Sequence, residues 1–341
     1  MRSFRPCARR VTVPSLQRLA LTERRRIDRV RDLVVVGNGT QMSEKAFVGD
    51  DIERRDGRVT STSWLRRHSL LCYFALCFGI SWGGILLMCA ATGFNLVAQQ
   101  PLETGLIFAM MLLGPSAGGL ILTAVLDGRA GLHHLGSGLM RWKLGARWYA
   151  VALLTTPLLL LAILWPLGAI VAPAFAPRFQ WELLGVGLVA GGFEELGWTG
   201  FATPRLLARQ RAGSAGLLLG LVWAFWHLLV DFRYNFEAMG MVWPLEFAIV
   251  YIATLTPYRM LMIGVYQNTG SVLLAVLMHA SYTSWLLVLF PATSPSQSLS
   301  WQAAFAIMLW LALACVLRRS SPGVEAHDRA RGMRFDVPAE R

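Results

Sequence analysis

The 341-residue chain is 55% hydrophobic and only 15% charged, with a formal net charge of +12. This apolar content exceeds what a soluble domain of this length needs for its core, so the composition excludes an ordinary soluble protein and indicates a membrane protein. About half of the 32 Lys and Arg residues lie before residue 69. A basic segment beside apolar spans favours the cytoplasmic side and anionic lipids, and no aromatic-interleaved basic motif points to nucleic acid.

Apolar runs of about twenty residues, the length that crosses a bilayer, occur about eight times. The chain is therefore predicted to be all-α, a polytopic membrane bundle of about eight transmembrane helices. Residues 1–68 form a predicted disordered cytoplasmic extension, 69–317 the membrane domain and 318–341 a charged cytoplasmic tail. The predicted helices span residues 69–91, 104–126, 147–173, 181–203, 213–232, 241–265, 270–290 and 300–317.

Basic residues recur in every second connecting loop. One set of loops contains basic residues such as Arg141, Arg205 and Arg318. The loop at residues 294–300, which belongs to the other set, has no Lys or Arg. Cytoplasmic loops carry the excess of basic residues in membrane proteins. Both termini are therefore predicted to be cytoplasmic.

Four titratable residues interrupt apolar helices. Glu194 and Glu195 are adjacent in one predicted helix, and His227 and His279 each lie in a later one. At about 1.5 Å of rise per residue, all fall roughly 13 to 21 Å from the cytoplasmic side. Ionisable side chains are costly in hydrocarbon and mark functional sites by default, so a shared, water-accessible cavity is predicted.

Helix geometry divides the roles of the two glutamates. Consecutive helical residues point about 100° apart, so one glutamate is expected to serve chemistry while the other binds a neighbouring group. Trp198, one turn beyond Glu194, is expected to wall the pocket. Thr283, one turn beyond His279, is placed to orient the imidazole or a water. The competing interpretation is a structural acid pair with two packed core histidines.

Three motifs in order resemble a known family. Glu-Glu-Leu-Gly-Trp, Trp-x-x-x-His and His-x-x-x-Thr are similar to the CPBP family (CAAX protease and bacteriocin-processing, also called ABI), which includes the type II CAAX prenyl endopeptidase. The resemblance covers about residues 70–317. The family pattern has Arg, Phe and Asn where this chain has Thr199, Trp223 and Thr283. Without the Arg, Glu195 lacks the partner that the motif implies, and Arg205 could substitute for it from the cytoplasmic end.

The resemblance implies an intramembrane endopeptidase in a bacterial inner membrane, acting on a peptide or lipidated protein among membrane lipids. Glu194 is the expected general base. His227 and His279 either polarise the scissile carbonyl or join Glu194 as ligands of a catalytic zinc. There is no His-Glu-x-x-His motif, so both the zinc-dependent and the metal-independent mechanisms stay open.

Two other classes of function compete with the protease. One is a catalytically silent family member that acts as a bacteriocin immunity or membrane binding protein. The other is a proton-coupled carrier, which the lack of a convincing internal repeat disfavours. Outside the motifs, Arg259 is expected to snorkel or to contact an acidic group, and Glu246 to snorkel or pair, with Asp231 and Arg233 near the interface.

Overall fold

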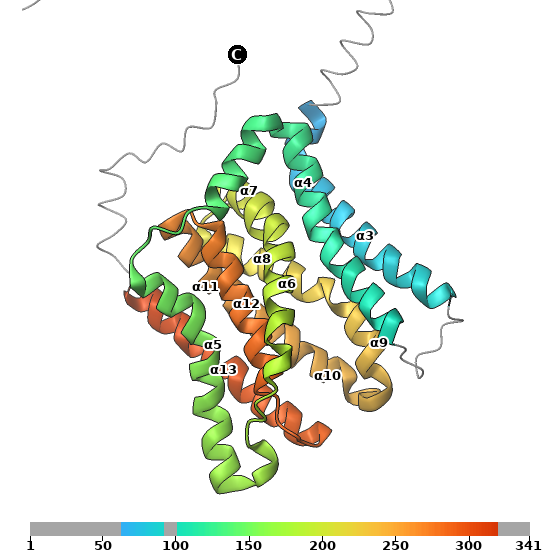
Figure 1. Ribbon diagram of the computed structural model, residues 1–341, viewed down its shortest axis with the longest axis vertical. Helices are drawn as coiled ribbons and strands as arrows, with labels where there is room; N and C mark the ends of the chain where they lie inside the picture. The colour runs from blue at the N-terminus through green and yellow to red at the C-terminus, as the bar shows by residue number, and fades with distance from the viewer. Residues whose placement is uncertain (1–62, 92–100, 320–341) are drawn as a thin grey trace, which may run out of the picture. The chain divides into compact units, whose positions relative to one another are not determined.

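The computed structural model describes residues 63–91 and 101–319, and in these ranges the chain folds into helices with no strand (Figure 1). Residues from Trp64 onward belong to one compact unit. The predicted N-terminal extension and C-terminal tail lie almost entirely outside the described residues. The all-α prediction is confirmed for the described part.

The helices follow one another with short connections. Short π-helical segments, Trp198–Ala202 and Ala248–Ala253, join α6 to α7 and α10 to α11. The helices in chain order are α3 (Ser69–Ala91), α4 (Pro101–Leu139), α5 (Ala146–Pro166), α6 (Leu184–Gly197), α7 (Thr203–Leu207), α8 (Ala212–Trp226), α9 (Leu228–Met239), α10 (Trp243–Phe247), α11 (Thr254–Thr269), α12 (Val272–Val288) and α13 (Pro295–Arg319).

Several helices meet the requirements of a bilayer. Among the described residues, five helical stretches are long and apolar enough to cross a membrane, and α8 and α12 are shorter apolar helices. Large apolar side chains such as Leu87 and Ile170 point outward, 72% and 82% exposed. Such surfaces are stable against lipid, so the protein is an integral membrane protein. The total of about eight crossings stays a prediction. The five stretches are Ser69–Ala91, Pro101–Leu139, Ala146–Val171, Leu228–Thr269 and Pro295–Arg319.

Two predicted boundaries are wrong. The predicted helix at 213–232 breaks at His227, because α8 ends at Trp226 and α9 begins at Leu228. The predicted helix at 104–126 continues to Leu139 across a kink at Gly128, whose φ of 60° and ψ of −150° suit glycine. Hydrophobic periodicity does not report the break at His227, because Trp226 and Leu228 on either side of it are apolar. The residues after Gly128 include Arg129 and His133, so the apolar run ends before the helix does.

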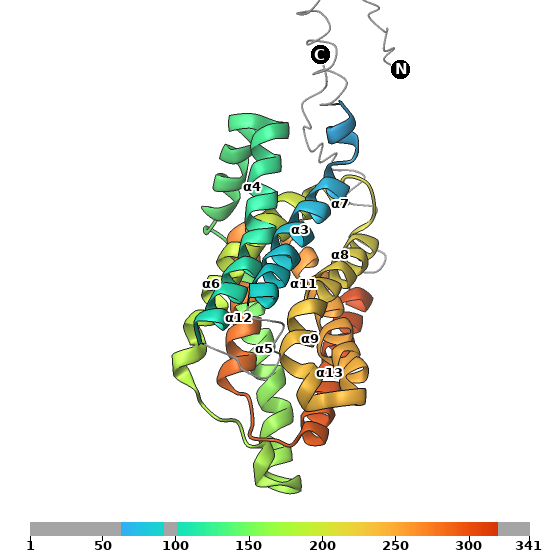
Figure 2. The same ribbon diagram turned by 90° about the vertical axis from the view of Figure 1, so that its right-hand side faces the viewer.

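Helix α6 lies between α12 and α4 (Figures 1 and 2). Glycines allow this close approach. A Cβ on Gly191 would lie 2.6 Å from the Val276 carbonyl oxygen of α12, and one on Gly119 of α4 would lie 2.7 Å from Gly197 Cα. Small residues at helix contacts bring backbones close together in membrane proteins. The glutamate-bearing end of α6 is thereby fixed against the helix that carries His279.

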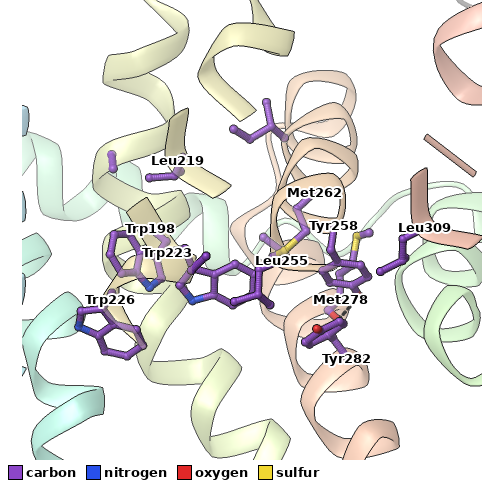
Figure 3. Packing of buried hydrophobic residues seen from close by; sticks show 14 of the residues in the cluster. Trp198, Leu219, Trp223, Trp226, Leu255, Tyr258, Met262, Met278, Tyr282 and Leu309 are labelled. Carbon is purple, nitrogen blue, oxygen red and sulfur yellow. Dashed lines mark hydrogen bonds between the residues drawn. The ribbon is translucent and has the colours of Figure 1, made fainter. Parts of the chain in front are cut away.

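Aromatic side chains fill the space around this contact (Figure 3). The rings of Trp198 and Trp226 meet edge to face at 5.7 Å, and those of Tyr258 and Tyr282 lie 4.5 Å apart. The Tyr258 hydroxyl donates to the Met278 carbonyl at 2.6 Å. Close packing of large rings leaves little freedom for the polar groups embedded among them.

Candidate active site

Glu195 is held on several sides in the interior. Both of its carboxylate oxygens accept hydrogen bonds from Arg259, each at 2.9 Å, and neither side chain has any exposed surface. The Thr199 hydroxyl donates to the same carboxylate. Arg259 also stacks on the Trp223 ring, with Cζ 4.0 Å from the ring centroid. A bidentate guanidinium pair of this kind fixes both charge and orientation, so Glu195 is a positioning group rather than a free base.

The sequence did not identify this partner. Arg205 was predicted to substitute for the Arg of the family motif. In the structure it binds Asp127 near the surface instead. Arg259 reaches Glu195 from α11, 64 residues further along the chain. A lone basic residue within a long apolar stretch was the available signal, since an intramembrane charge requires a counter-charge. The acidic group that Arg259 contacts is thus Glu195 of the same protein.

His279 lies between the two glutamates. Its Nδ1 is 2.7 Å from Glu195 Oε1, and its Nε2 is 3.9 Å from Glu194 Oε2. A carboxylate at Nδ1 accepts a hydrogen bond from that nitrogen and fixes the orientation of the ring. The separation at Nε2 is too long for a direct hydrogen bond and matches a bridging water or substrate atom. His279 is thus oriented by Glu195, and the orientation of a water by Thr283 stays a prediction.

Glu194 receives two indole N–H groups. Trp223 Nε1 donates to Glu194 Oε2 at 3.0 Å, and Trp198 Nε1 donates to the same oxygen at 3.3 Å. Trp198 was expected to wall the pocket, but it is fully buried and does not line the cavity. Its role in the structure is to hold the carboxylate. Glu194 keeps its other oxygen for a ligand, as a general base requires.

His227 lies at the break between α8 and α9. Its Nδ1 is 2.9 Å from the Trp223 carbonyl oxygen, which leaves Nε2 as the nitrogen that can face a ligand. The imidazole stacks on the Tyr251 ring with centroids 5.0 Å apart. The helix break therefore presents this imidazole at the wall of a cavity.

That cavity has a volume of about 580 Å³ and brings the predicted residues together. Glu194, His227, His279 and Thr283 all line it, whereas Glu195 lies behind the wall. The remaining walls come mainly from apolar and aromatic side chains of α4, α8, α9, α12 and α13. A cavity with a few convergent polar groups among apolar walls is the usual form of a binding site.

Among the described residues, no three His, Cys, Asp or Glu side chains are grouped closely enough to hold a metal ion. Glu194 Oε2 and His279 Nε2 are 3.9 Å apart, while Glu194 Oε2 and His279 Nδ1 have hydrogen-bond partners within the protein. Zinc ligands lie about 2 Å from the ion in a tetrahedral arrangement. The zinc site of Glu194, His227 and His279 stays a prediction.

The fold and the site define an integral membrane protein with paired carboxylates and imidazoles around one internal cavity. Residues 176–285 match the family model described as "Type II CAAX prenyl endopeptidase Rce1-like". The matched segment includes both glutamates and both histidines, so the predicted resemblance to this family is confirmed over these residues.

A curated relative is also similar to part of the chain. CAAX prenyl protease 2 of Methanococcus maripaludis is 29% identical over 97 residues, which cover 27% of this chain and 35% of the relative. The chain therefore spans about a third of the length of the curated relative that it matches.

Proposed function

We propose that this protein is an intramembrane endopeptidase that hydrolyses a peptide bond of a lipidated or membrane-associated substrate, in the manner of CAAX processing. The observation that carries the proposal is the shared cavity of Glu194, His227 and His279. A base and two imidazoles facing one apolar space are the groups that amide hydrolysis by an activated water requires. The matched family and the name of the curated relative support the same reaction class.

In the proposed mechanism, a water between Glu194 and His279 attacks the scissile carbonyl carbon. Glu194 takes the proton of the water as the C–O bond forms, and the carbonyl oxygen becomes an oxyanion. His279, charged and oriented by Glu195, donates from Nε2 to this oxyanion. Glu194 then passes its proton to the leaving nitrogen as the C–N bond breaks. His227 supplies a second polar group on the same wall.

Glu195 and Arg259 act indirectly in this mechanism. Their buried bidentate pair places a fixed carboxylate 2.7 Å from His279 Nδ1. The carboxylate holds the imidazole so that Nε2 faces Glu194, as the buried carboxylate orients the histidine in a serine protease triad. Both residues are therefore proposed as positioning residues.

A silent family member is the second candidate function. It is favoured by Thr283, which lines the cavity at the position of the motif's Asn and offers a shorter polar side chain. A silent protein of this kind would keep the cavity and bind a peptide or toxin without cleaving it.

The proposal is tested by peptide cleavage in detergent micelles. Quenched fluorescent peptides, both farnesylated CAAX and leader-type sequences, are incubated with wild type, His227→Ala and His279→Ala, each with and without chelator. We expect cleavage by wild type and a loss of about 10²-fold or more in both variants, the usual size of an electrostatic or acid–base contribution. Cleavage that is indifferent to both substitutions, or absent from wild type across the panel, contradicts the proposal. Chelator sensitivity reports separately on a metal.

A further inference from the structure

A second pair of acids lies on the α9–α10 side of the cavity. Asp231 of α9 and Glu246 of α10 are both buried, 2% and 4% exposed. Their carboxyl groups are close enough to interact with each other. The proposed mechanism makes no use of either residue.

The hydrogen bonds of the pair are incomplete. Asp231 accepts from Asn235 Nδ2 at 2.6 Å and from Trp243 Nε1 at 2.8 Å, so both of its oxygens have donors. Glu246 Oε2 is buried without a hydrogen-bond partner. Within the part of the chain that the structure describes, neither acid forms an ion pair with a basic side chain, and the neighbouring Arg233 pairs with Glu103 at 2.9 Å.

Glu246 lines the same cavity as the catalytic candidates, whereas Asp231 lies behind the wall. Glu246 and Asn235 line the cavity together with Glu194 and His227. Asp231 lies one helical turn beyond His227, whose carbonyl accepts from the Asp231 amide at 2.9 Å. Glu246 lies five residues before Tyr251, whose ring stacks on His227. Five residues span roughly 6 to 8 Å along a helix axis. An extended peptide covers that distance in about two residues.

Two adjacent buried carboxyl groups cannot both be charged unless a counter-charge is present. An unpartnered buried acceptor such as Glu246 Oε2 also lowers stability. A cationic group entering the cavity supplies both the counter-charge and the missing donor. In a peptide substrate, such a group is the ammonium of Lys or the guanidinium of Arg.

We propose that Glu246, supported by Asp231, forms a subsite that binds a Lys or Arg side chain of the substrate within about four residues of the scissile bond. This inference rests on the proposed function, because it assumes that the substrate has a scissile bond. The binding of a basic peptide to the subsite does not depend on cleavage. The apolar walls then hold the aliphatic or lipid part of the substrate while the acid pair selects its basic residue.

The first arm of the test measures specificity. Farnesylated quenched peptides are compared by kcat/KM. They differ only by Lys, Arg, Gln or Leu at one position within four residues of the scissile bond, and the farnesylated cysteine is kept in all of them. We expect one position where wild type prefers Lys or Arg over Gln by about tenfold or more, the size of a charge-assisted hydrogen bond. Glu246→Gln should reduce this preference to less than about threefold, and Glu237→Gln, which changes an exposed glutamate on α9, should retain it.

The second arm does not depend on cleavage. Binding of the same Lys and Gln peptides, labelled for fluorescence anisotropy, is measured for Glu194→Gln and for Glu194→Gln combined with Glu246→Gln. Tighter binding of the Lys peptide that disappears in the double variant supports the subsite even if no peptide is cleaved. Equal binding of Lys and Gln peptides overturns it. A preference that survives Glu246→Gln also overturns it, because Gln retains a neutral hydrogen-bonding group but not the charge.

Discussion

The decisive interaction at the scale of single residues is the buried pair of Glu195 and Arg259. It converts one of two adjacent glutamates into a fixed anion that orients His279, while Glu194 remains on the cavity wall. The family's Arg is missing at Thr199, and a guanidinium from a different helix occupies the position beside the carboxylate. Glu195 is thus paired with an Arg that lies 64 residues further along the chain.

Arg259→Met is expected to destabilise the protein by about 3–5 kcal/mol, because it leaves the carboxylate of Glu195 buried without a counter-charge. Arg259→Lys should lie between this variant and wild type, since a single ammonium cannot form both hydrogen bonds. The matched control is Arg205→Lys, whose pair with Asp127 is partly exposed, with side chains 21% and 37% accessible. Thermal unfolding in detergent measures all three. Equal melting temperatures for Arg259→Met and wild type would refute the structural role of the pair.

Trp223→Phe restores the residue of the family motif but removes the N–H that donates to Glu194 at 3.0 Å. We expect kcat/KM to fall by about tenfold, because a hydrogen bond to a charged group contributes about 1.5–3 kcal/mol. Trp198→Phe should have a smaller effect, since its bond is longer at 3.3 Å. Steady-state cleavage of one peptide compares the variants, and an unchanged rate for Trp223→Phe speaks against an oriented Glu194.

At the scale of helices, the site depends on the close contact of α6 with α12. Gly187 and Gly191 face the backbone of α12, where a Cβ would lie 2.5 Å and 2.6 Å from the carbonyl oxygens of Ala280 and Val276. Both glycines precede the glutamates by one or two turns, and the carbonyls flank His279. The distance between the acid and the imidazole is therefore set by this contact.

Gly191→Ala is expected to separate α6 from α12 and to lower both stability and activity. Overpacking of this kind costs typically about 1–3 kcal/mol, because backbone atoms must move. Gly185→Ala on the same helix is the control, since a Cβ there meets no atom within 4 Å. Melting temperature and cleavage rate are measured together. If Gly191→Ala behaves like Gly185→Ala in both, the helix contact does not position the site.

The helices and the residues that share the cavity could be predicted from the sequence, because apolar runs and intramembrane charges are local signals. It did not find the break at His227 or the partner of Glu195. The break lies within an uninterrupted apolar run, and Arg259 is distant in sequence from the acid that it binds. The predicted role of Trp198 was also wrong. Helical spacing predicts the side of the helix on which a residue lies, but not the atom to which its side chain donates a hydrogen bond.

For the whole molecule, orientation in the membrane follows from the positive-inside rule rather than from the structure. The basic loops place Ser137 on the predicted cytoplasmic side and Ser296 on the opposite side. Both residues are exposed, so each can report on the side at which it lies.

Single cysteines at Ser137 and Ser296, in a protein whose five native cysteines are replaced by alanine, test the orientation. In intact cells, a membrane-impermeant maleimide should label Ser296→Cys and leave Ser137→Cys unlabelled until the membrane is opened. The opposite pattern would invert the topology. Labelling of both in intact cells would show that the two loops share the outer side.

The central claim is that Glu194 activates the water that cleaves the peptide bond. Its most direct test is the single-turnover cleavage rate of a farnesylated CAAX peptide by wild type and Glu194→Gln in liposomes, with melting temperatures measured in parallel. We expect a loss of about 10³-fold for a variant of near wild-type stability, because Gln keeps the shape and an acceptor for the tryptophans but cannot take a proton. A Glu194→Gln protein that cleaves within a factor of about three of wild type would contradict this role of Glu194.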